Sequence, residues 1–427
     1  MPINATPLRA EFPALSSGRA YLDGPGGTQV PRQVIDRMVD YLIDKNANHR
    51  GAFATSQASD ALILEARSAF ADFINAPGDG EIIFGPNMTG LTLSISRALA
   101  LDLKPGDEVV VTRLDHNANV APWMLIARDR GCTVRQVDFD VEDCTLRLDQ
   151  LDQCLNERTK LVAVGYASNA VGTINPVAEI VQKAHRVGAL CYVDAVHYAP
   201  HGPIDVQALA CDFLVFSVYK IFGPHLGVLY GRRDLLSRLQ AYKVRPASDV
   251  PPEKFETGTQ NHEGIAGGLG AIEYLARLGE RFGGEHAERY AGQFAGRRLL
   301  LKQAMGAIRA YESELTRSLL PALESISGLR IYGITDSRAL DRRTPTVSFT
   351  LPHVPPRRVA EELAQEGIFV WDGNYYALDV TERLDLEKTG GMVRVGLVHY
   401  NTTSEIERLV AGLQQISAKA ATPRGPG

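Results

Sequence analysis

The chain has 427 residues, of which 45% are apolar and 22% are charged, and its formal net charge is −5. This length favours two or three domains, and the composition is that of an ordinary globular protein. A weakly acidic chain with interspersed charges has no electrostatic footprint for nucleic acid or for an anionic membrane. No stretch is long and apolar enough to span a bilayer, and residues 1–9 lack the apolar core of a signal peptide. We therefore expect a cytoplasmic enzyme.

The five cysteines lie at 132, 144, 154, 191 and 211, and none follows position 211. Their number is odd, their spacing is irregular, and no histidine stands at ligand spacing from them. This pattern argues against a disulfide framework and against a zinc site. We expect reduced thiols and no bound metal.

Short apolar runs alternate with helix-like stretches from about residue 20 to 231. Seven of these runs have the character of strands, at 81–84, 108–112, 134–138, 161–164, 189–194, 211–217 and 227–230. Their apolar residues are continuous, which is typical of strands that are covered on both faces. We predict an α/β domain over residues 20–265 with a mainly parallel seven-stranded sheet. Ligands of such sheets bind at the carboxyl ends of the strands.

The remainder of the chain changes character. A helical region from 264 to 320 is followed by strand-like runs at 328–332, 346–350 and 392–396. Strands interleaved with amphipathic helices predict a smaller α+β domain over residues 266–415, with residues 1–19 packing on it. We expect residues 416–427 to be a disordered tail.

Two strand ends carry a complementary pair of charged groups. Lys220 follows the run that ends at Ser217, and Asp194 ends the preceding run. An amine and a carboxylate at such positions suit pyridoxal phosphate, because the amine can hold the cofactor's aldehyde and the carboxylate can keep its ring nitrogen protonated. Either residue alone is more often a solvated lysine or a helix cap. The pair in tandem favours the cofactor site.

Three other strand ends are followed by polar segments. Residues 85–90 contain Asn87, Met88 and Thr89 before a predicted helix, and this turn either holds a phosphate or places Asn87 as an ordinary helix cap. His116 is a candidate to stack on the cofactor ring and to shuttle protons, although a lone histidine is more often packed or at the surface. Asn169 could donate a hydrogen bond to the cofactor's phenolic oxygen or could be a turn residue.

Eight motifs occur in order along nearly the whole chain, from about 20 to 415. They are YLD at 21–23, RGA at 50–52, DHNAN at 115–119, SNAVGTINP at 168–176, YVDAVHY at 192–198, FSVYKIFGP at 216–224, FETGTQN at 255–261 and VRVGLVHYNT at 393–402. In these motifs the chain resembles class V of the fold-type I pyridoxal phosphate enzymes, and most closely the cysteine desulfurase-like and selenocysteine lyase-like branch.

The resemblance implies roles for individual residues. Lys220 would bind the cofactor's aldehyde, Asp194 would contact the pyridine nitrogen, and His116 would stack on the ring. The phosphate would be held by residues from the helix start and from the end of a strand, which are Asn87, Met88, Thr89 and Ser217. Thr259 matches a residue that completes the phosphate site of the other subunit, so the resemblance implies a homodimer with shared active sites.

Substrate contacts are implied in the same way. Arg394 matches the residue that clamps the substrate's α-carboxylate, for which a guanidinium fork is well shaped. Its alternative is a surface arginine on a strand. Arg50, in the RGA motif, and Tyr376, in the segment before Arg394, are further expected substrate-binding residues.

The departures from the resemblance concern reactivity. Desulfurases usually have histidine where this chain has Tyr219, which could still reach the phosphate, and glutamine where it has His197, which would alter the contact to the phenolic oxygen. Desulfurases of this branch accept sulfur on a loop cysteine. The matching segment here is 372–377, with Tyr376 near the cysteine's place, and a phenol cannot form a persulfide.

These observations lead to one principal hypothesis and to alternatives from other classes. We expect a pyridoxal phosphate enzyme that acts on a small L-amino acid by desulfurase-like lyase chemistry without an enzyme persulfide. An aminotransferase or an amino-acid epimerase would use the same residues. A catalytically degenerate protein that binds the cofactor and serves as an interaction partner is the alternative outside enzymology.

Overall fold

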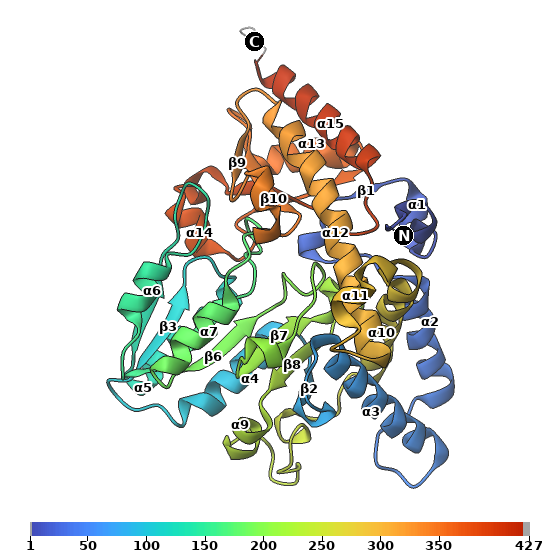
Figure 1. Ribbon diagram of the computed structural model, residues 1–427, viewed down its shortest axis with the longest axis vertical. Coiled ribbons are helices and arrows are strands. Elements are labelled where there is room, and N and C mark those ends of the chain that lie inside the picture. Colours follow the sequence, from blue (N-terminus) through green and yellow to red (C-terminus); the bar gives the residue numbers. More distant parts are fainter. Residues whose placement is uncertain (1, 422–427) are drawn as a thin grey trace.

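The computed structural model describes residues 2–421 and has two parts, each with its own sheet (Figure 1). The larger sheet has seven strands in the order β2-β8-β7-β6-β5-β3-β4. All its neighbouring strands are parallel except β8, which is antiparallel to both β2 and β7. The predicted fold class, an α/β protein with a mainly parallel seven-stranded sheet, is therefore confirmed. The seven strands are β2 (Ile82–Gly85), β3 (Glu108–Thr112), β4 (Thr133–Val137), β5 (Thr159–Gly165), β6 (Leu190–Asp194), β7 (Phe213–Ser217) and β8 (Gly227–Gly231).

Both faces of this sheet are covered by helices, which explains why its strands are continuously apolar. Alternate strand residues enter two separate buried clusters: Val162 and Val193 belong to one, and Leu161 and Tyr192 to the other. The first cluster is shared with α3 (Ala54–Ile74), α6 (Leu148–Cys154), α7 (Val177–Arg186), α8 (Val206–Leu209) and α10 (His262–Phe282). The second is shared with α4 (Met88–Ala100), α5 (Ala121–Arg130) and α9 (Arg233–Arg238).

The smaller part is built on a four-stranded antiparallel sheet in the order β12-β13-β10-β9. Its strands are β9 (Arg330–Tyr332), β10 (Thr346–Thr350), β12 (Trp371–Gly373) and β13 (Met392–Gly396). The strand β1 (Ala20–Tyr21), near the N-terminus, pairs in parallel with β11 (Ile368–Phe369) beside it. Helices α13 (Pro356–Gln365), α14 (Leu378–Arg383) and α15 (Thr403–Ala421) complete this part.

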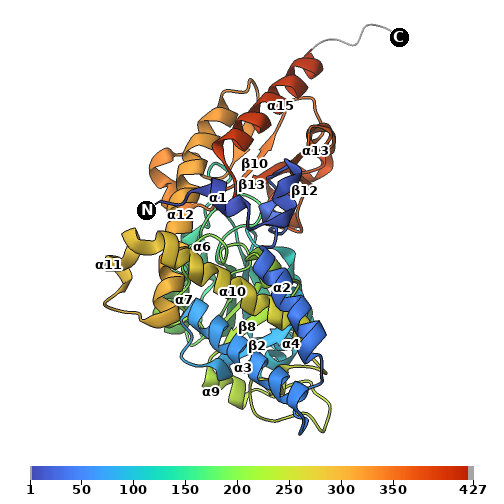
Figure 2. The same ribbon diagram turned by 90° about the vertical axis from the view of Figure 1, so that its right-hand side faces the viewer.

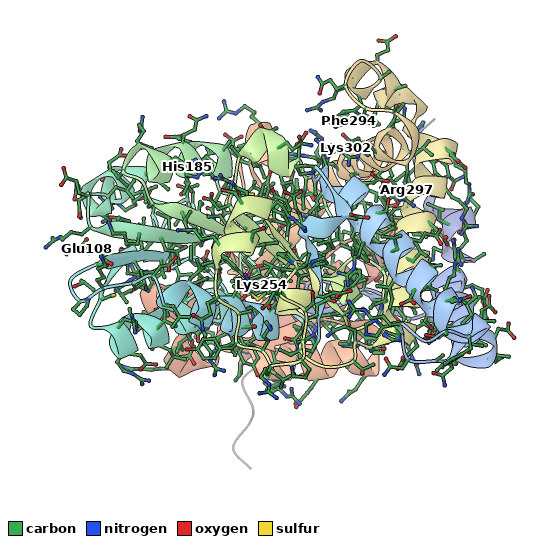
Figure 3. All side chains as sticks on the ribbon, turned by 90° about the horizontal axis from the view of Figure 1, so that it is seen from below. Glu108, His185, Lys254, Phe294, Arg297 and Lys302 are labelled. Carbon is green, nitrogen blue, oxygen red and sulfur yellow. The ribbon has the colours of Figure 1, made fainter. Side chains whose placement is uncertain are left out.

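The helical region predicted over 264–320 is interrupted. Helix α10 ends at Phe282, the short helix α11 (Ala287–Tyr290) follows, and α12 (Gly296–Glu324) then runs from the larger part into the smaller one (Figure 2). At its start, Arg297 and Arg298 contact Asp72 of α3 at 2.8 and 2.9 Å (Figure 3). Helix α12 also continues through Pro321, beyond the predicted end of the helical region at residue 320.

At both ends of the chain, the structure differs from what the sequence predicts. Phe12, which follows α1 (Ala5–Arg9), contacts Phe222 and Tyr274 of the larger part as well as Tyr400. The N-terminal residues therefore lie at the junction and not on the smaller part alone. The predicted tail from 416 is wrong for residues 416–421, because α15 continues through them and buries Ile416 in the core of the smaller part. Residues 422–427 lie outside the described part of the chain.

Helix α2 (Arg32–Asp40) packs on α10 at the outside of the larger part. Across residues 2–421, none of the helices combines the length and the apolar character that crossing a membrane requires.

Candidate active site

The register of the large sheet brings the ends of four strands to one edge. Gly165, at the end of β5, pairs with Asp194 at the end of β6. Ser217, at the end of β7, pairs with Gly227, which also pairs with Gly85 at the end of β2. The segments that follow these strands therefore meet, although they are far apart in the sequence. This is the edge at which open α/β sheets bind their ligands.

A cavity of about 1270 Å³ lies at this edge, between the large sheet and the smaller part. Twelve of the residues singled out from the sequence line it: Asn87, Met88, Thr89, His116, Asn169, Asp194, His197, Ser217, Tyr219, Lys220, Tyr376 and Arg394. Sequence reasoning missed Pro25, Trp371 and Tyr375, which also line it. Only their proximity to recognised motifs could have indicated them.

Lys220 lies on a short 3₁₀ turn directly after β7, and 9% of the residue is exposed. Its Nζ donates a hydrogen bond to the carbonyl oxygen of Pro25. Burial and, to a smaller extent, the nearby Arg394 cation lower the pKa of the Lys220 amine to about 7 against the opposing effect of Asp194. Near neutral pH a large fraction of this amine is unprotonated, which is the form that attacks an aldehyde.

Asp194 is buried, and its Oδ1 accepts a hydrogen bond from the backbone N–H of Val196 at 2.9 Å. Burial raises the pKa of its carboxyl to about 7, while that hydrogen bond and Lys220 act in the opposite direction. A carboxyl with this pKa can share a proton with a pyridine nitrogen.

The start of α4 faces the same cavity. Asn87 caps this helix, since its Oδ1 accepts from the N–H of Gly90 at 2.8 Å, so the capping interpretation of Asn87 is confirmed. The N–H of Met88 donates to Ser217 Oγ at 2.9 Å. A Cβ on Gly227 would lie 2.6 Å from the Asn87 carbonyl carbon, so only glycine allows this close approach. The result is a helix N-terminus beside a serine hydroxyl, which is chemistry suited to a phosphate.

The His116 ring stacks on Tyr376, with ring centroids 5.5 Å apart and an interplanar angle of 19°. The carbonyl of Tyr376 accepts a hydrogen bond of 2.6 Å from the N–H of Asn117, which docks this segment against the larger part. Burial lowers the pKa of His116 to about 4, and the cations Lys220 and Arg394 contribute in the same direction. His116 is therefore neutral at pH 7.

Arg394 extends from the middle of β13 into the cavity and is 4% exposed. Its Nη1 donates to the carbonyl of Asn169 at 2.7 Å, and its guanidinium carbon lies 4.1 Å from the centre of the Tyr375 ring. Its Nε has no hydrogen-bond partner, and among residues 2–421 Arg394 forms no ion pair, although the carboxyl of Asp23 acts on it electrostatically from a longer distance. Burial lowers the pKa of Arg394 to about 10, so it remains a cation at neutral pH. A buried cation without an ion-pair partner marks a place for an anionic ligand.

Two further cavity residues contact other residues that line the cavity. Asn169 donates its amide N–H to the carbonyl of Tyr375 at 2.9 Å, and its buried Oδ1 has no partner. The Asn169 amide nitrogen carries a second N–H, so the hydrogen bond that we expect it to donate to a phenolic oxygen stays a prediction. The Tyr219 ring stacks on His225 at 4.9 Å.

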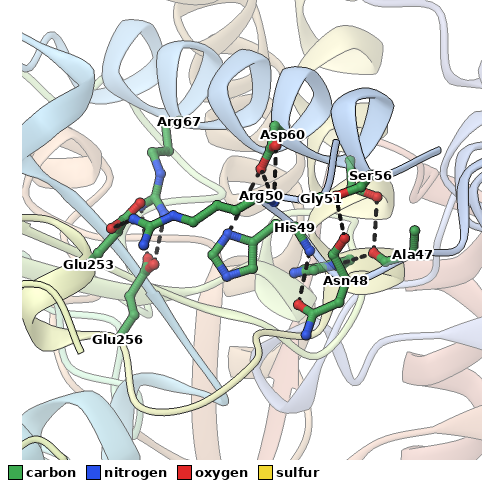
Figure 4. A network of polar contacts seen from close by, with 12 residues as sticks. Ala47, Asn48, His49, Arg50, Gly51, Ser56, Asp60, Arg67, Glu253 and Glu256 are labelled. Carbon is green, nitrogen blue, oxygen red and sulfur yellow. Dashed lines mark hydrogen bonds and ion pairs between the residues drawn. The ribbon is translucent and has the colours of Figure 1, made fainter. Parts of the chain in front are cut away.

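Two predicted site residues do not line the cavity of their own chain. Arg50 forms an ion pair with Glu253 on the surface, and its side chain is 60% exposed (Figure 4). Thr259 is exposed in the loop that follows Glu256. Glu256 forms a buried ion pair with Arg67 at 2.7 Å, so both segments are fixed near each other at one surface. Arg50 therefore does not line the cavity of its own chain, and a contact between Arg50 and a substrate stays a prediction.

The residues of the cavity fit pyridoxal phosphate. They provide an amine of lowered pKa for the aldehyde, a buried carboxylic acid for the ring nitrogen, and a helix N-terminus with hydroxyl groups for the phosphate. Together with the large parallel sheet, they define the class of pyridoxal phosphate enzymes.

Comparisons with known proteins agree with this class. The family model for aminotransferase class-V matches residues 20–297 and 283–409. The cysteine desulfurase of Enterobacter sp. (strain 638) is 34% identical over 96% of this chain and 97% of its own length. The probable cysteine desulfurase of Streptomyces coelicolor is also 34% identical, over 96% of both chains.

Solved structures extend the similarity to three dimensions. The apo structure of the cysteine desulfurase from Thermococcus onnurineus NA1 superposes with a TM-score of 0.86, at 28% identity over 98% of this chain and 99% of that chain. The cysteine desulfurase CsdA from Escherichia coli gives 0.81, at 27% identity over 96% and 98%. The protein belongs to the class V aminotransferase family and is a pyridoxal phosphate-dependent enzyme.

Proposed function

We propose that this protein is a desulfurase-like lyase that acts on a small L-amino acid and forms no persulfide on the enzyme. The observation that carries the proposal is Arg394, a buried cation that forms no ion pair and whose Nε has no hydrogen-bond partner, in the same cavity as the Lys220 amine. An L-amino acid presents a carboxylate to the first group and an α-hydrogen to the second. The cavity therefore offers the two contacts that define this class of substrate.

Different side chains bind the substrate and transfer the proton. Arg394 binds and orients the α-carboxylate, and Lys220 Nζ accepts the α-proton. When bound, pyridoxal phosphate supplies an electron sink for the electron pair that the proton leaves behind. Asp194 holds the proton of the ring nitrogen, and the neutral His116 covers one side of the site. Departure of a sulfur group from the β-carbon then completes a lyase reaction.

The positions of the cysteines support the statement that no persulfide forms on the enzyme. None of the five lines the cavity. Burial raises the pKa of Cys144 to about 12 and also raises the pKa values of Cys191 and Cys211. The reactive form of cysteine is the thiolate, and burial in apolar surroundings disfavours ionisation of the thiol. We therefore infer that sulfur leaves as sulfide, sulfite or a free thiol.

The decisive experiment incubates purified holoenzyme with a panel of L-amino acids and measures keto acid, ammonia, sulfide and the opposite enantiomer. Sulfide release by the protein, with activity retained in each single Cys→Ser variant, would support the proposal. Amino transfer to a keto acid would establish an aminotransferase, and inversion would establish an epimerase. A persulfide trapped on one cysteine, with loss of activity in its serine variant, would overturn the mechanism. Cofactor binding without turnover of any amino acid would favour the degenerate binding protein.

We further infer that the active enzyme is a homodimer in which Thr259 reaches the phosphate site of the partner. The exposure of Thr259 and its absence from the cavity of its own chain support this inference. A Lys220→Ala protomer mixed with a Thr259→Ala protomer would place both lesions in one site and leave the other intact. Rescued activity after subunit exchange is expected. Its absence, with exchange verified, would contradict sharing between subunits.

A further inference from the structure

His197 lies behind the cofactor site, three residues after Asp194, and is 4% exposed. Its Nε2 lies 3.3 Å from Thr344 Oγ1, on the segment that leads into β10, and the same hydroxyl lies 3.3 Å from the carbonyl oxygen of Gly172. When this hydroxyl donates to Nε2, the ring proton of His197 is on Nδ1. Among residues 2–421, the contact with Thr344 is the one hydrogen bond of the His197 ring, and the residue lines the cavity. One nitrogen of this ring is therefore fixed by the smaller part, and the other remains available to a ligand in the cavity.

A second histidine lies against this ring. His201 follows His197 by one turn of the chain, because the N–H of Ala199 bonds to Ala195 O at 2.8 Å and that of His201 bonds to Tyr198 O at 2.9 Å. The His197 and His201 rings meet edge to face, with centroids 5.6 Å apart and an interplanar angle of 68°. His201 thus limits how far the His197 ring can rotate.

The His201 ring is fixed in turn by a buried acid on α12. His201 Nδ1 lies 2.8 Å from Glu312 Oε2, and the two side chains are 4% and 2% exposed. A carboxylate at this distance selects the tautomer of the histidine and sets the direction of its ring. Glu312 has no other role in the cavity, which it does not line.

We propose that His201 and Glu312 are positioning residues that hold the His197 ring with Nδ1 toward the phenolic oxygen of bound pyridoxal phosphate. The proposal rests on the cofactor site at Lys220. It concerns a position at which the resemblance to desulfurases fails, since those enzymes usually have glutamine in place of His197. Besides His201, the charged or titratable groups that act on His197 are His116, Lys220 and Arg394, which are cationic when protonated. Burial, together with these groups, holds the pKa of His197 well below its ordinary value. His197 therefore acts as a neutral ring whose orientation decides which nitrogen it presents.

The test is a pH titration of the visible absorption band of the holoenzyme. A hydrogen bond to an oxyanion lowers the pKa of that oxygen, so loss of the positioned donor should raise the titration midpoint by about one pH unit. We expect this shift in Glu312→Gln, which retains the size of the side chain, in His201→Gln, and in Thr344→Val, which removes the partner of Nε2. Three variants on different elements keep the test decisive if one of them does not fold.

A double-mutant cycle separates positioning from a general structural role. In the His197→Gln background, a further His201→Gln change should leave the midpoint within about 0.3 units, because coupled residues are not additive. The matched control is His185→Gln on α7, where His185 (labelled in Figure 3) pairs with Asp212 at 2.8 Å. This second histidine–carboxylate pair does not line the cavity, so its loss should not shift the midpoint.

Two outcomes would overturn the proposal: additive shifts in the double variant, or an unshifted midpoint in all three single variants that retain a normal visible band. Failure of the cofactor site itself would look different. In that case the wild-type protein would show no visible band, and borohydride would attach no cofactor to Lys220.

Discussion

One wall of the cavity is formed by the ends of parallel strands, and the other by β13 and the segment 371–376 of the smaller part. On the first wall, Asp194 is the last residue of β6 and Lys220 lies on the turn after β7, and the hydrogen-bonded ladders of these strands fix the backbone. On the second wall, Tyr375 and Tyr376 have φ angles of 57° and 60°, in the left-handed region. Non-glycine residues rarely adopt this conformation, at a cost on the order of 1–3 kcal/mol each.

The strained segment is held by contacts with the first wall. The carbonyl groups of Tyr375 and Tyr376 accept hydrogen bonds from Asn169 and Asn117. The Tyr376 ring stacks on His116 of the first wall, and the Tyr375 ring packs on Arg394 within the second wall. The first wall is therefore rigid by its own construction, whereas the second depends on docking. We expect changes in the first wall to abolish chemistry and changes in the second to weaken substrate binding.

The largest effect is expected at Lys220. Lys220→Ala should reduce turnover by about 10²–10⁴-fold, because the variant lacks both the aldehyde-binding amine and the proton acceptor. Peptide mapping after borohydride treatment of the wild type should find the cofactor on the peptide that contains Lys220. Cofactor on another lysine would show that Lys220 is not the residue that binds the aldehyde.

On the opposite wall, Arg394→Ala should raise KM by about 10- to 100-fold with a smaller change in kcat. Hydrogen bonds to a charged group contribute about 1.5–3 kcal/mol, and this variant loses those to the substrate carboxylate. Steady-state kinetics would measure the separation of KM from kcat, and Arg394→Lys should recover part of the loss. A fall in kcat alone would place Arg394 in the chemical step and remove the contrast between the walls.

The pH dependence connects the two walls. Since the pKa of Lys220 is lowered to about 7, capture of the cofactor by the apoenzyme should be fast above that pH and should fall about tenfold per unit below it. Part of the lowering comes from Arg394, so Arg394→Gln should move the midpoint to higher pH. Stopped-flow absorbance would follow the capture. A midpoint that stays in place would mean that the two groups do not interact.

The smallest effect is expected at Tyr376, which is 75% exposed. Tyr376→Ala removes the stacking on His116 and should raise KM by about threefold, at the lower end of what an aromatic pair contributes. Tyr376→Phe retains the ring and should behave as the wild type. Equal losses in both variants would instead assign a role to the phenol group.

The large sheet was predictable from the sequence because a strand buried on both faces has to be continuously apolar. Each of the seven predicted runs is a strand, and 108–112 in the larger part and 346–350 and 392–396 in the smaller one agree residue for residue. The strands β1, β11 and β12 were not predicted. They have only two or three residues each, too few for a periodic pattern, and they form because partners distant in the sequence are available.

The sequence by itself determined the fold class and the absence of any cysteine after 211, and it indicated Lys220 and Asp194 as the candidate cofactor pair, because these follow from local patterns and from composition. Only the tertiary structure decided which side chains meet. The unpaired state of Arg394, the pairing of His201 with Glu312 across 111 positions, and the exclusion of Arg50 from the cavity depend on how separate elements pack. Burial and contact arise from the whole fold, so the pKa values of Lys220 and Asp194 could not be read from the residues that surround them in the chain.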